Sequence, residues 1–470
     1  MAVAARQVEE VEGSPVNAMA SACLRATYGL VAEAANFLGT RAHALFLRRS
    51  ERWLPDLLRD EEAVGRLRGA ILVFAPSSGE VVTGLPLIRL LAGNRPDVPI
   101  LICAATASGL AAAENASLES VRLAADSLRL YRRAVQMLAP KGMVIVQVAH
   151  AAGLPVNLIA ELAANKLPVV VVNGYVPDRD LRASSGWVWR GLAAIYGDIT
   201  AYCMQTAGDV DRVVSLGADP GRVSVAGNMK FDAALQDVQP EASESLAREL
   251  GIGVQDAVVV AGSTHPDEER MVLEAFRVVS DGAPGARMIV APRAMRRAEQ
   301  VAGLAREMGF AAELRSRMSG RPQIIVLDTM GELKPLYGAS WAAFIGGTLV
   351  PVGGHNVLEP AVWARPVVFG PHVEHTSGAA DMLLRDGGAL MVRDGSELGR
   401  VLVKLVEDTG LRQAMGRRAL ESVRSMGGAA AVCARLVEGL MLGPAERSAP
   451  DRAPSAPGAL ASADVAGADE

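Results

Sequence analysis

Short hydrophobic runs alternate with amphipathic stretches along most of this chain. The runs are dominated by Val, Ile, Leu and Ala, which is typical of strands buried on both faces of a parallel sheet. They are residues 71–75, 100–105, 143–148, 169–173, 258–263, 288–292, 324–328, 342–347 and 367–370. The segments between them have helical periodicity, as in LRLYRRAVQMLAP before residue 143. This alternation predicts doubly wound α/β domains.

The length of 470 residues exceeds what one hydrophobic core usually organises, so we expect two domains. The polar stretch AALQDVQPEASES at residues 233–245 marks the expected break. We therefore predict an N-terminal Rossmann-like domain at residues 53–236 and a C-terminal one at residues 237–440. In such folds ligands bind outside the carboxyl ends of the parallel strands.

The two ends of the chain differ in composition from the rest. We expect a flexible start over residues 1–18, which lacks the basic and apolar regions of a signal peptide. Residues 19–52 predict an amphipathic helix, because Arg25, Glu33 and Arg41 leave no uncharged run of the ~18 residues that a spanning helix needs. This helix could lie on a membrane surface or pack on the protein itself. The tail at residues 441–470, rich in Ala, Ser, Pro, Asp and Gly, predicts disorder.

Composition narrows the classes of function. Hydrophobic residues make up 50% of the chain and charged residues 21%, as in ordinary globular proteins. A net charge of −5 and 4% aromatic residues argue against nucleic acid as a partner. The 4 cysteines form no CxxC and the 6 histidines no HExxH, so we expect no disulfide framework, no metal site and no cofactor.

One segment, AFIGGTLVPVGGHNVLEPAVWARPVVFGP at residues 343–371, carries the strongest functional pattern. It is typical of a strand, a glycine loop, a helix and a second strand. Paired glycines let the backbone approach a ligand, and a helix opened by Asn356, with Glu359 in its first turn, offers N–H groups to an anion. The segment predicts a nucleotide-sugar pocket, although a capping box and a tight turn alone could also explain it.

Further motifs stand in a fixed order along the chain. They are SSGEVVTGLPLI at 77–88, VAGNMKFD at 225–232, AGSTHPDEE at 261–269, VAPR at 290–293, DTMGELKPLY at 328–337 and GGHNVLEP at 353–360. Together they resemble the 3-deoxy-D-manno-octulosonic acid (Kdo) transferases, over a stretch from about residue 24 to about residue 440.

The resemblance implies a fold, a reaction and a location. It implies the GT-B arrangement, in which two Rossmann-like domains face each other across a cleft, the first binding the acceptor and the second a CMP-sugar. It implies an inverting, metal-independent transfer of Kdo from CMP-Kdo to a lipid A precursor in lipopolysaccharide core biosynthesis. The partners would be the CMP-Kdo donor, the lipid A precursor and the inner membrane surface, with the protein peripheral on the cytoplasmic side.

Two residues are candidates for catalysis. Glu80 stands in the first helical turn after a buried strand, where it could simply complement the helix dipole. The resemblance instead makes the Gly79-Glu80 pair a match for the family's general base, which takes the proton of the acceptor hydroxyl. The same resemblance makes Lys230 a group that stabilises the departing CMP, where the alternative is an ordinary surface lysine.

The other candidates belong to the donor pocket. Arg293 follows a buried strand, and its guanidinium suits a phosphate because it can pair with two oxygens at once. Thr329 and Glu332 also satisfy a capping-box pattern, which by itself could explain their turn. The residues that the resemblance and the glycine loop assign to substrate binding are Gly79, Ser263, Pro292, Arg293, Met330, Gly331, Glu332, Asn356, Val357, Leu358 and Glu359.

The first departure from the family pattern follows the strand that ends at Val148. Family members carry E-x-E-L-W-P-N there, whereas this chain has HAAGLPVN at residues 150–157. Leu154 and Asn157 keep register, but Ala151 and Gly153 replace both acids. The family's first glutamate is associated with transition-state stabilisation, so that role has no occupant here. His150 could substitute for it or could be a core histidine.

The second departure is at Asn173-Gly174-Tyr175, where the family has Asn-Ala-Arg. Asp178, Arg179 and Arg182 lie nearby in the sequence but out of register. Both departures fall in the acceptor half, so we expect a divergent acceptor, with loss of activity as the other interpretation.

Two alternatives of other classes remain open at this point. A nucleotide-sugar 2-epimerase would share the fold and a similar C-terminal pocket, but it would need no amphipathic N-terminal helix. A non-catalytic nucleotide-binding paralogue would explain the missing acids, but not the retention of Gly79, Glu80 and Lys230.

Overall fold

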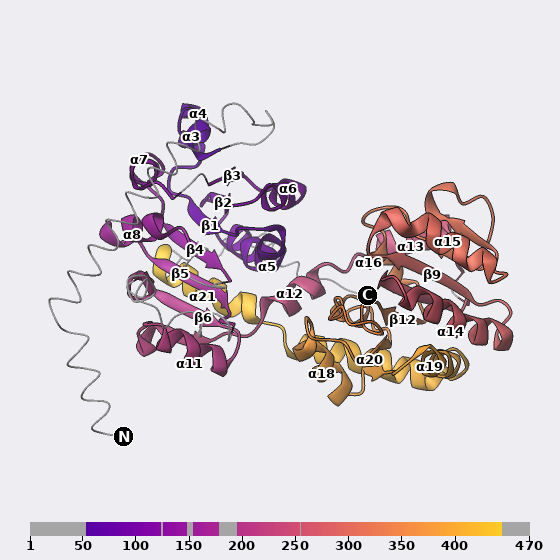
Figure 1. Ribbon diagram of the computed structural model, residues 1–470. Coiled ribbons are helices and arrows are strands. Elements are labelled where there is room, and N and C mark those ends of the chain that lie inside the picture. The colour runs from indigo at the N-terminus through magenta and orange to yellow at the C-terminus, as the bar shows by residue number, and fades with distance from the viewer. Residues whose placement is uncertain (1–52, 124–125, 148–153, 178–194, 254, 444–470) are drawn as a thin grey trace, which may run out of the picture.

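Two parallel sheets, each flanked by helices, organise the molecule. The structure is a computed structural model that describes residues 53–123, 126–147, 154–177, 195–253 and 255–443. Each sheet has seven strands, and every strand pair recorded within them is parallel. Figure 1 shows the two sheets lying in separate lobes. The predicted class of two doubly wound parallel-sheet domains is confirmed.

The first sheet has the strand order β3-β2-β1-β4-β5-β6-β7. Its order reverses direction between β1 and β4, which is the switch point where ligands bind in doubly wound sheets. The strands are β1 (Ile71–Phe74), β2 (Ile100–Ala104), β3 (Ser120–Arg122), β4 (Gly142–Val146), β5 (Val169–Gly174), β6 (Ala201–Met204) and β7 (Val223–Val225).

The second sheet has the order β10-β11-β9-β8-β12-β13-β14, with its switch point between β8 and β12. Its strands are β8 (Val258–Thr264), β9 (Arg287–Pro292), β10 (Ala312–Leu314), β11 (Ile324–Val326), β12 (Ala342–Ile345), β13 (Val367–Phe369) and β14 (Ala389–Met391).

Helices cover both faces of each sheet. Those before the second sheet are α3 (Leu54–Leu57), α4 (Glu61–Arg66), α5 (Ser78–Asn94), α6 (Ala107–Asn115), α7 (Leu128–Leu138), α8 (Val156–Ala164), α11 (Ala207–Ser215), the 3-10 turn η2 (Pro220–Arg222), α12 (Met229–Gln236) and α13 (Pro240–Glu249). The later ones are α14 (Glu268–Gly282), η3 (Met295–Arg297), α15 (Ala298–Glu307), η4 (Arg315–Arg317), α16 (Leu333–Gly338), α17 (Leu358–Ala361), α18 (Ser377–Arg385), α19 (Gly395–Glu407), α20 (Thr409–Ser425) and α21 (Ala429–Met441).

The strands are apolar on both faces because each face supports its own core. Phe74 packs in the cluster that contains Tyr131 of α7, whereas Val73, its neighbour in β1, packs in the cluster that contains Ile88 of α5. Successive side chains of a strand point to opposite faces, so one uninterrupted apolar run serves two helical layers.

Every strand expected from the hydrophobic runs is present. The strands that the runs did not indicate are β3, β6, β7, β10 and β14. Four of these, all except β6, are three-residue strands at the edges of the sheets. An edge strand needs only one paired neighbour and one covered face, so its hydrophobic run is short and weak.

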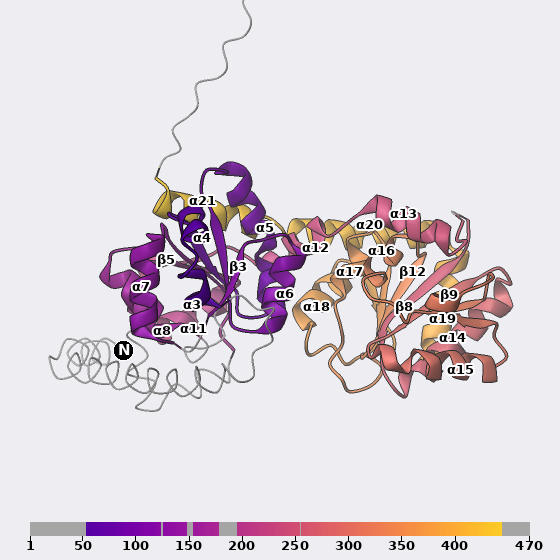
Figure 2. The same ribbon diagram turned by 90° about the horizontal axis from the view of Figure 1, so that it is seen from above.

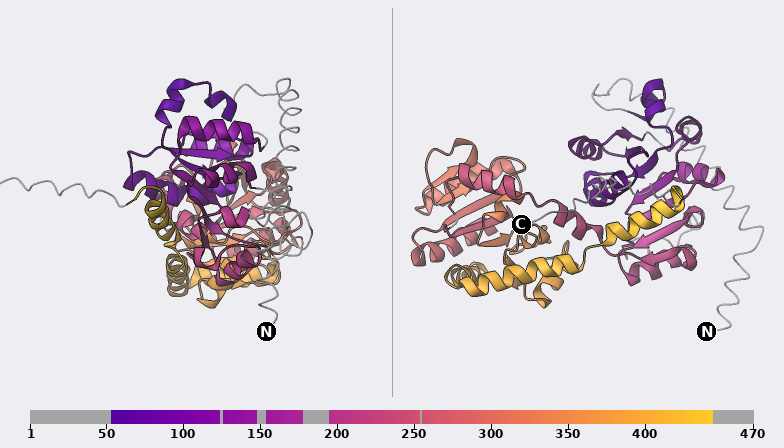
Figure 3. Two further views of the ribbon diagram at one scale, coloured as in Figure 1. Left: turned by 90° about the vertical axis from the view of Figure 1, so that its left-hand side faces the viewer. Right: turned by 180° about the vertical axis from the view of Figure 1, so that it is seen from behind.

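Helices α12 and α21 connect the two lobes. The expected polar break at residues 233–245 is helical over most of its length, formed by α12 and α13 around a short interruption. Helix α21 lies in the range that we assigned to the C-terminal domain, yet Cys433 and Val437 are buried in the core of the first sheet beside Ile88. Figures 2 and 3 show the yellow C-terminal helices running from the second lobe back to the first.

The ends of the chain include two of the expected segments. The amphipathic helix predicted over residues 19–52 and the tail predicted over residues 441–470 lie outside the described residues, except for 441–443. Among the residues that the structure describes, no helix combines the length and hydrophobicity needed to cross a bilayer.

Candidate functional site

The motifs of the second half gather along one edge of the second sheet. Strands β11, β9, β8 and β12 are consecutive neighbours in that sheet and run parallel. Each strand ends in a motif or is followed within a few residues by one: Met330–Glu332, Arg293, the Ser263–Glu268 segment and the glycine loop, respectively. Because the carboxyl ends of parallel strands meet at one edge, four loops far apart in sequence form one continuous surface.

A buried glutamate holds two of these loops together. The carboxylate of Glu268 accepts hydrogen bonds from the backbone N–H groups of His265 (2.8 Å), Gly347 (2.5 Å) and Leu349 (3.3 Å). Its residue is 0% exposed. Burial raises the pKa of Glu268, and the surrounding backbone N–H groups oppose that rise. Glu268 therefore acts as a clamp between the loop after β8 and the loop after β12.

The sequence interpretation missed this clamp. Acidic residues in the first turn of a helix, such as Glu268 and Glu269, are a common pattern and by themselves indicate no contact with another loop. A local signal did exist, because Glu268 stands three residues after His265, at the start of α14. The bond to Gly347 spans 79 positions, and only the pairing of β8 with β12 reveals it.

Two histidines meet above the glycine loop. The Nε2 atoms of His265 and His355 are 2.7 Å apart, and their rings are nearly parallel at 10° with centroids 5.0 Å apart. Gly347 between them has a φ of +70°, and a Cβ there would lie 3.3–3.4 Å from both rings. Burial, with the charge of Arg293, lowers the pKa of His265, and burial with the neighbouring cations lowers the pKa of His355 to about 4.

Arg293 lies beside this pair, as a strand-end position predicts. It follows β9 directly, and its backbone N–H donates to the carbonyl of Thr264 at 2.9 Å. The side chain is exposed, and its charge acts on His265, His355 and Glu359. The guanidinium makes no ion pair within the described residues. Such a fork of donors is suited to an anionic group.

Pro292 and Ser263 shape the backbone around that arginine. Pro292 is buried and pairs with Thr264 at the end of β9. Ser263 is half-buried, has a φ of +58° and lies where the register between β8 and β9 shifts. These two expected ligand residues therefore support the edge of the sheet, and only Ser263 has a partly exposed surface.

The turn after β11 differs in one detail from the expectation. Helix α16 begins at Leu333 with Glu332 as its N-cap, and the Thr329 hydroxyl donates to the Glu332 carboxylate instead of closing a full capping box. Glu332 also forms an ion pair with Arg315 at 3.0 Å. Gly331 is exposed, and Met330 is 78% exposed, so this turn presents a thioether and open backbone at the edge.

The GGHN loop ends in a shorter helix than expected. Helix α17 begins at Leu358, with Val357 as N-cap, because the Asn356 side chain accepts from the Leu358 N–H at 3.1 Å. Asn356 thus precedes the helix by two residues and also donates to Glu359 at 3.4 Å. The side chains of Val357 and Leu358 are buried in the core, so only their backbone can face a ligand.

Glu359 is half-buried at the same edge. Burial raises the pKa of Glu359, and the nearby Lys334 ammonium opposes the rise. Lys334 in turn forms an ion pair with Asp237 at 2.5 Å. Because Asp237 is the C-cap of α12, this chain of charges joins the glycine-loop helix to the helix that links the lobes.

Glu80 lies at the carboxyl end of β1, in the first turn of α5. Both the N–H (3.0 Å) and the hydroxyl of Ser77 donate to its Oε2 atom, which forms the expected helix-start contact. Neither contact uses Oε1. The carboxylate is half-buried, and Gly79 beside it is exposed. The position follows the switch-point strand of the first sheet.

Lys230 lies in the first turn of α12 and is exposed. Its backbone N–H donates to the Asn228 side chain at 3.0 Å, and the preceding N–H of Met229 donates to the Asn173 side chain at 2.8 Å. Helix α12 packs against both α5 and α17. The structure therefore sets the helix of Lys230 between the helix of Glu80 and the helix of Glu359.

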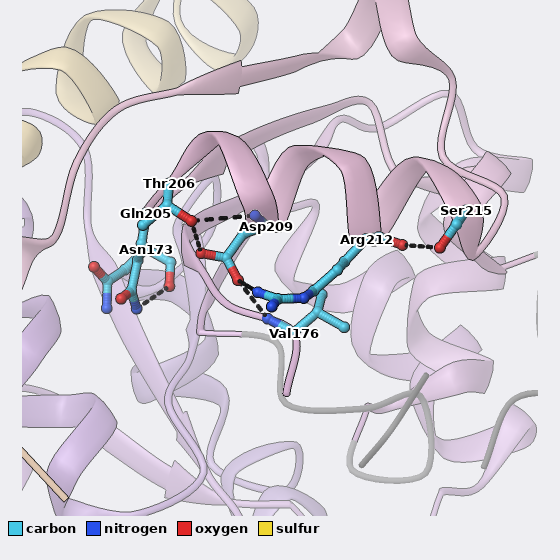
Figure 4. A network of polar contacts seen from close by, with 7 residues as sticks. All are labelled: Asn173, Val176, Gln205, Thr206, Asp209, Arg212 and Ser215. Atoms are coloured by element: carbon cyan, nitrogen blue, oxygen red, sulfur yellow. Dashed lines mark hydrogen bonds and ion pairs between the residues drawn. The ribbon is translucent and has the colours of Figure 1, made fainter. Parts of the chain in front are cut away.

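The second sequence departure has a structural role in this arrangement. Asn173 is fully buried with a φ of +53°, and its side chain caps the start of α12. Figure 4 shows the loop that follows: Gln205 donates to the Asn173 carbonyl, and Asp209 accepts from the N–H of Val176 and from Thr206. The Asn of the motif is kept for the fold, while the changed Tyr175 is 39% exposed.

The remaining candidates of the first half are only partly described. His150, Ala151 and Gly153 lie outside the described residues, as do Asp178, Arg179 and Arg182. Leu154 is buried, and Asn157 holds Asp126 through its backbone and its side chain. Across the described part of the chain, no group of three His, Cys, Asp or Glu side chains has the geometry to hold a metal ion.

Comparison with protein families gives a match over the first half. Residues 48–233 match the family model described as 3-deoxy-D-manno-octulosonic-acid transferase (kdotransferase). The 3-deoxy-D-manno-octulosonic acid transferase of Haemophilus influenzae is 28% identical over 76% of this chain and 84% of its own length. That of Aquifex aeolicus is 26% identical over 74% of this chain and 88% of its own length.

Two further comparisons show a partial match in length and a match in fold only. A bifunctional glycosyltransferase/methyltransferase of Fusobacterium nucleatum is 33% identical over 49% of this chain, and the match spans 36% of that longer protein. Among solved structures, UDP-GlcNAc 2-epimerase from Neisseria meningitidis, bound to UDP-GlcNAc, covers 78% of this chain and 99% of its own at a TM-score of 0.55. At 12% identity this second likeness shows the GT-B type of fold alone.

Proposed function

We propose that this chain is a glycosyltransferase of the Kdo transferase family and transfers Kdo from CMP-Kdo to a lipid A precursor during lipopolysaccharide core synthesis. CMP-Kdo and the lipid precursor would be its two substrates. The second domain would hold the nucleotide and the first the acceptor.

The observation that carries the proposal is the continuous edge of the second sheet. Four motif loops meet there, and an exposed Arg293 stands without an ion pair in the described residues beside two histidines. An arginine fork at a strand end is suited to the single phosphate of CMP. The exposed turn at Met330 and Gly331 offers backbone and a flat apolar surface for the base.

Glu80 would act as the general base. As the acceptor hydroxyl attacks the anomeric carbon of Kdo, its proton passes to the Glu80 carboxylate and the bond from that carbon to the phosphate oxygen breaks. Oε2 is held by Ser77, which fixes the carboxylate and leaves Oε1 for the proton. Attack opposite the leaving CMP inverts the anomeric carbon.

Lys230 would stabilise the CMP that departs. Negative charge builds on the phosphate as the glycosidic bond breaks, and a cation in a fixed position lowers the energy of that state. Asn173 and Asn228 fix the first turn of α12, so the backbone of Lys230 is rigid while its ammonium stays exposed. The contacts of α12 with both α5 and α17 support a position between acceptor and donor.

The acceptor would be reached at the inner membrane, on its cytoplasmic side. The amphipathic pattern of residues 19–52 supports attachment to the lipid surface, where a lipid A precursor resides. The missing acids at 151 and 153 support an acceptor site rebuilt relative to the family. Retention of Glu80 and Lys230 supports catalysis over a role as a non-catalytic paralogue.

Calorimetry with free nucleotides tests the donor assignment. CMP should bind the full chain more tightly than UMP or UDP, and cytidine, which lacks the phosphate, should bind far more weakly because Arg293 has no anion to pair with. Binding of UDP that equals or exceeds that of CMP would refute the CMP assignment and favour the epimerase alternative.

A further inference from the structure

The contact between His265 and His355 restricts the charge that the pair can carry. At 2.7 Å between Nε2 atoms, one nitrogen must carry the hydrogen and the other must present its lone pair. Two imidazolium rings would place two hydrogens between those nitrogens. The pair can therefore be neutral or singly protonated, but not doubly protonated.

A single added proton would leave the contact intact. In the neutral pair the donor ring has an unprotonated Nδ1 atom, because each neutral imidazole carries only one N–H. A proton taken from solvent at that Nδ1 turns the donor ring into imidazolium and keeps its Nε2–H pointing at the partner. The bridge is then charge-assisted and stronger.

The surroundings hold the pair neutral in the absence of a ligand. The charged and titratable groups that act on the pair or on its loops are Arg293, Arg297, Glu268, Glu269 and His375. Arg297 is already matched by Glu269 in an ion pair of 2.6 Å, and Glu268 is turned toward backbone N–H groups. Burial is the main cause that lowers the pKa of both histidines, and the guanidinium of Arg293, which has no ion pair within the described residues, adds to it.

We propose that the His265–His355 pair takes up one proton from solvent when the phosphate of the donor nucleotide binds beside Arg293. This inference rests on the proposed function, because it assigns the anion that neutralises Arg293. Once the anion offsets the guanidinium, the repulsion that Arg293 exerts on a charged pair falls, and the added charge becomes a further cation for the phosphate. The pair would be an anion-responsive part of the donor site that also supports CMP as it leaves.

Because CMP binding and proton uptake by the pair are coupled, the affinity for CMP should depend on pH. The pKa of His355 in the free protein is about 4, and a bound anion raises it. Between the free and the bound pKa the complex holds more protons than its components, so affinity falls as pH rises. Since the pair accepts at most one proton, Kd can change by at most about tenfold per pH unit from this source.

Calorimetry in buffers of different ionisation enthalpy measures the protons taken up. CMP would be titrated into the full chain at pH 7.2 in HEPES and in Tris, alongside His355→Gln and a control, His372→Gln. His372 lies in a neighbouring loop outside the pair. Titration of the CMP phosphate itself is common to all three proteins and cancels in the difference.

The wild type and the His372→Gln control should take up a larger fraction of a proton than His355→Gln, and the difference should not exceed one. Equal proton uptake in all three proteins, with CMP still bound, would overturn this inference alone. If CMP does not bind the wild type, the proposed donor and this inference fail together.

Nuclear magnetic resonance of the histidine ring nitrogens provides a test on the unmodified protein, in case His355→Gln fails to fold. Addition of CMP at neutral pH should move one ring of the pair toward imidazolium shifts, while the free protein shows two neutral rings. Two neutral rings in the saturated complex would contradict the proposal.

Discussion

The carboxyl ends of the strands in the two sheets differ in how closely their motifs resemble those of the Kdo transferases. At the second sheet, four adjacent strand ends carry the motifs that resemble the Kdo transferases, and the buried Glu268 joins two of these loops, those after β8 and β12. At the first sheet, Glu80 follows β1 as expected, but Ala151, Gly153 and Tyr175 stand where the resemblance leads us to expect two acids and an arginine.

The difference teaches that the residues that build the first domain are distinct from those expected to carry its chemistry. The family model matches residues 48–233, which is the half whose motifs have changed. Within that half, the buried strand Ile71–Phe74 and the buried Asn173, which accepts from the Met229 N–H, belong to the framework of the first domain. Of the changed positions, 151 and 153 lie outside the described residues, and Tyr175 is 39% exposed.

The largest expected effect comes from substituting Glu80, the base that we propose for the first domain. Glu80→Gln keeps the shape of the side chain but cannot accept the acceptor proton. General base catalysis contributes about 10²–10⁴-fold, so turnover should fall by that factor. Steady-state assays of Kdo transfer would measure it, with CMP affinity unchanged because the donor loops lie on the other sheet.

Glu61→Gln is the matched control for that substitution. Glu61 is also a first-turn glutamate, in α4, but it is exposed and away from both motif edges. Its substitution should leave turnover unchanged. Turnover of Glu80→Gln within a few-fold of wild type would show that the acceptor edge has been rebuilt around another base, with His150 the next residue to substitute.

The next effect should appear at the intact edge. Arg293→Ala removes the guanidinium expected to bind the phosphate, so CMP binding should weaken by about 1.5–3 kcal/mol, the range for a hydrogen bond to a charged group. Calorimetry would measure it beside Arg270→Ala, an exposed arginine of α14. Equal losses in the two variants would mean that Arg293 does not contact the donor.

Glu268→Gln tests whether the clamp organises the intact edge. The amide has one acceptor oxygen, so at least one of the three backbone N–H groups loses its partner in a buried place. We expect a loss of about 1–3 kcal/mol in the free energy of unfolding, measured by urea denaturation. Glu274→Gln, on the exposed face of the same helix, should change stability by less than about 0.5 kcal/mol.

The difference in free energy of unfolding between wild type and Glu268→Gln should depend on pH. Burial raises the pKa of Glu268 above its ordinary value of 4.5, so the folded state binds this proton more tightly than the unfolded state. Its contribution to stability is then fully present below pH 4.5 and declines as pH rises through the folded pKa. The stability advantage of wild type over Glu268→Gln should therefore shrink as pH rises, and an advantage that grows with pH would contradict the assignment.

Deletion of residues 1–52 should have the smallest effect on the stability and CMP affinity of the two domains. The truncated protein should no longer sediment with vesicles that contain anionic lipid, while CMP affinity and unfolding stay close to those of the full chain. Persistent sedimentation of the truncated protein would place membrane attachment elsewhere on the molecule.

Sequence alone predicted the sheets and the position of the edge, because buried strands and paired glycines leave local patterns. It did not predict the His265–His355 contact or the Glu268 clamp, since these join loops 79–90 positions apart. It also gave α17 too early a start, because an Asn side chain that bonds two residues ahead looks like a helix cap.

The sequence also did not predict that α21 packs in the core of the first domain. Nothing in the sequence of α21 indicates which core it joins, and only its packing against α5 shows that it returns to the first domain.

Transfer itself is the most direct test of the central claim, that an intact donor edge serves an altered acceptor edge. The full chain would be incubated with a lipid A precursor and CMP-Kdo generated in place, and the lipid analysed by mass spectrometry, with Glu80→Gln in parallel. The account predicts lipid heavier by one or more Kdo residues with wild type and far less with the variant. Binding of CMP without any gain in lipid mass would contradict it.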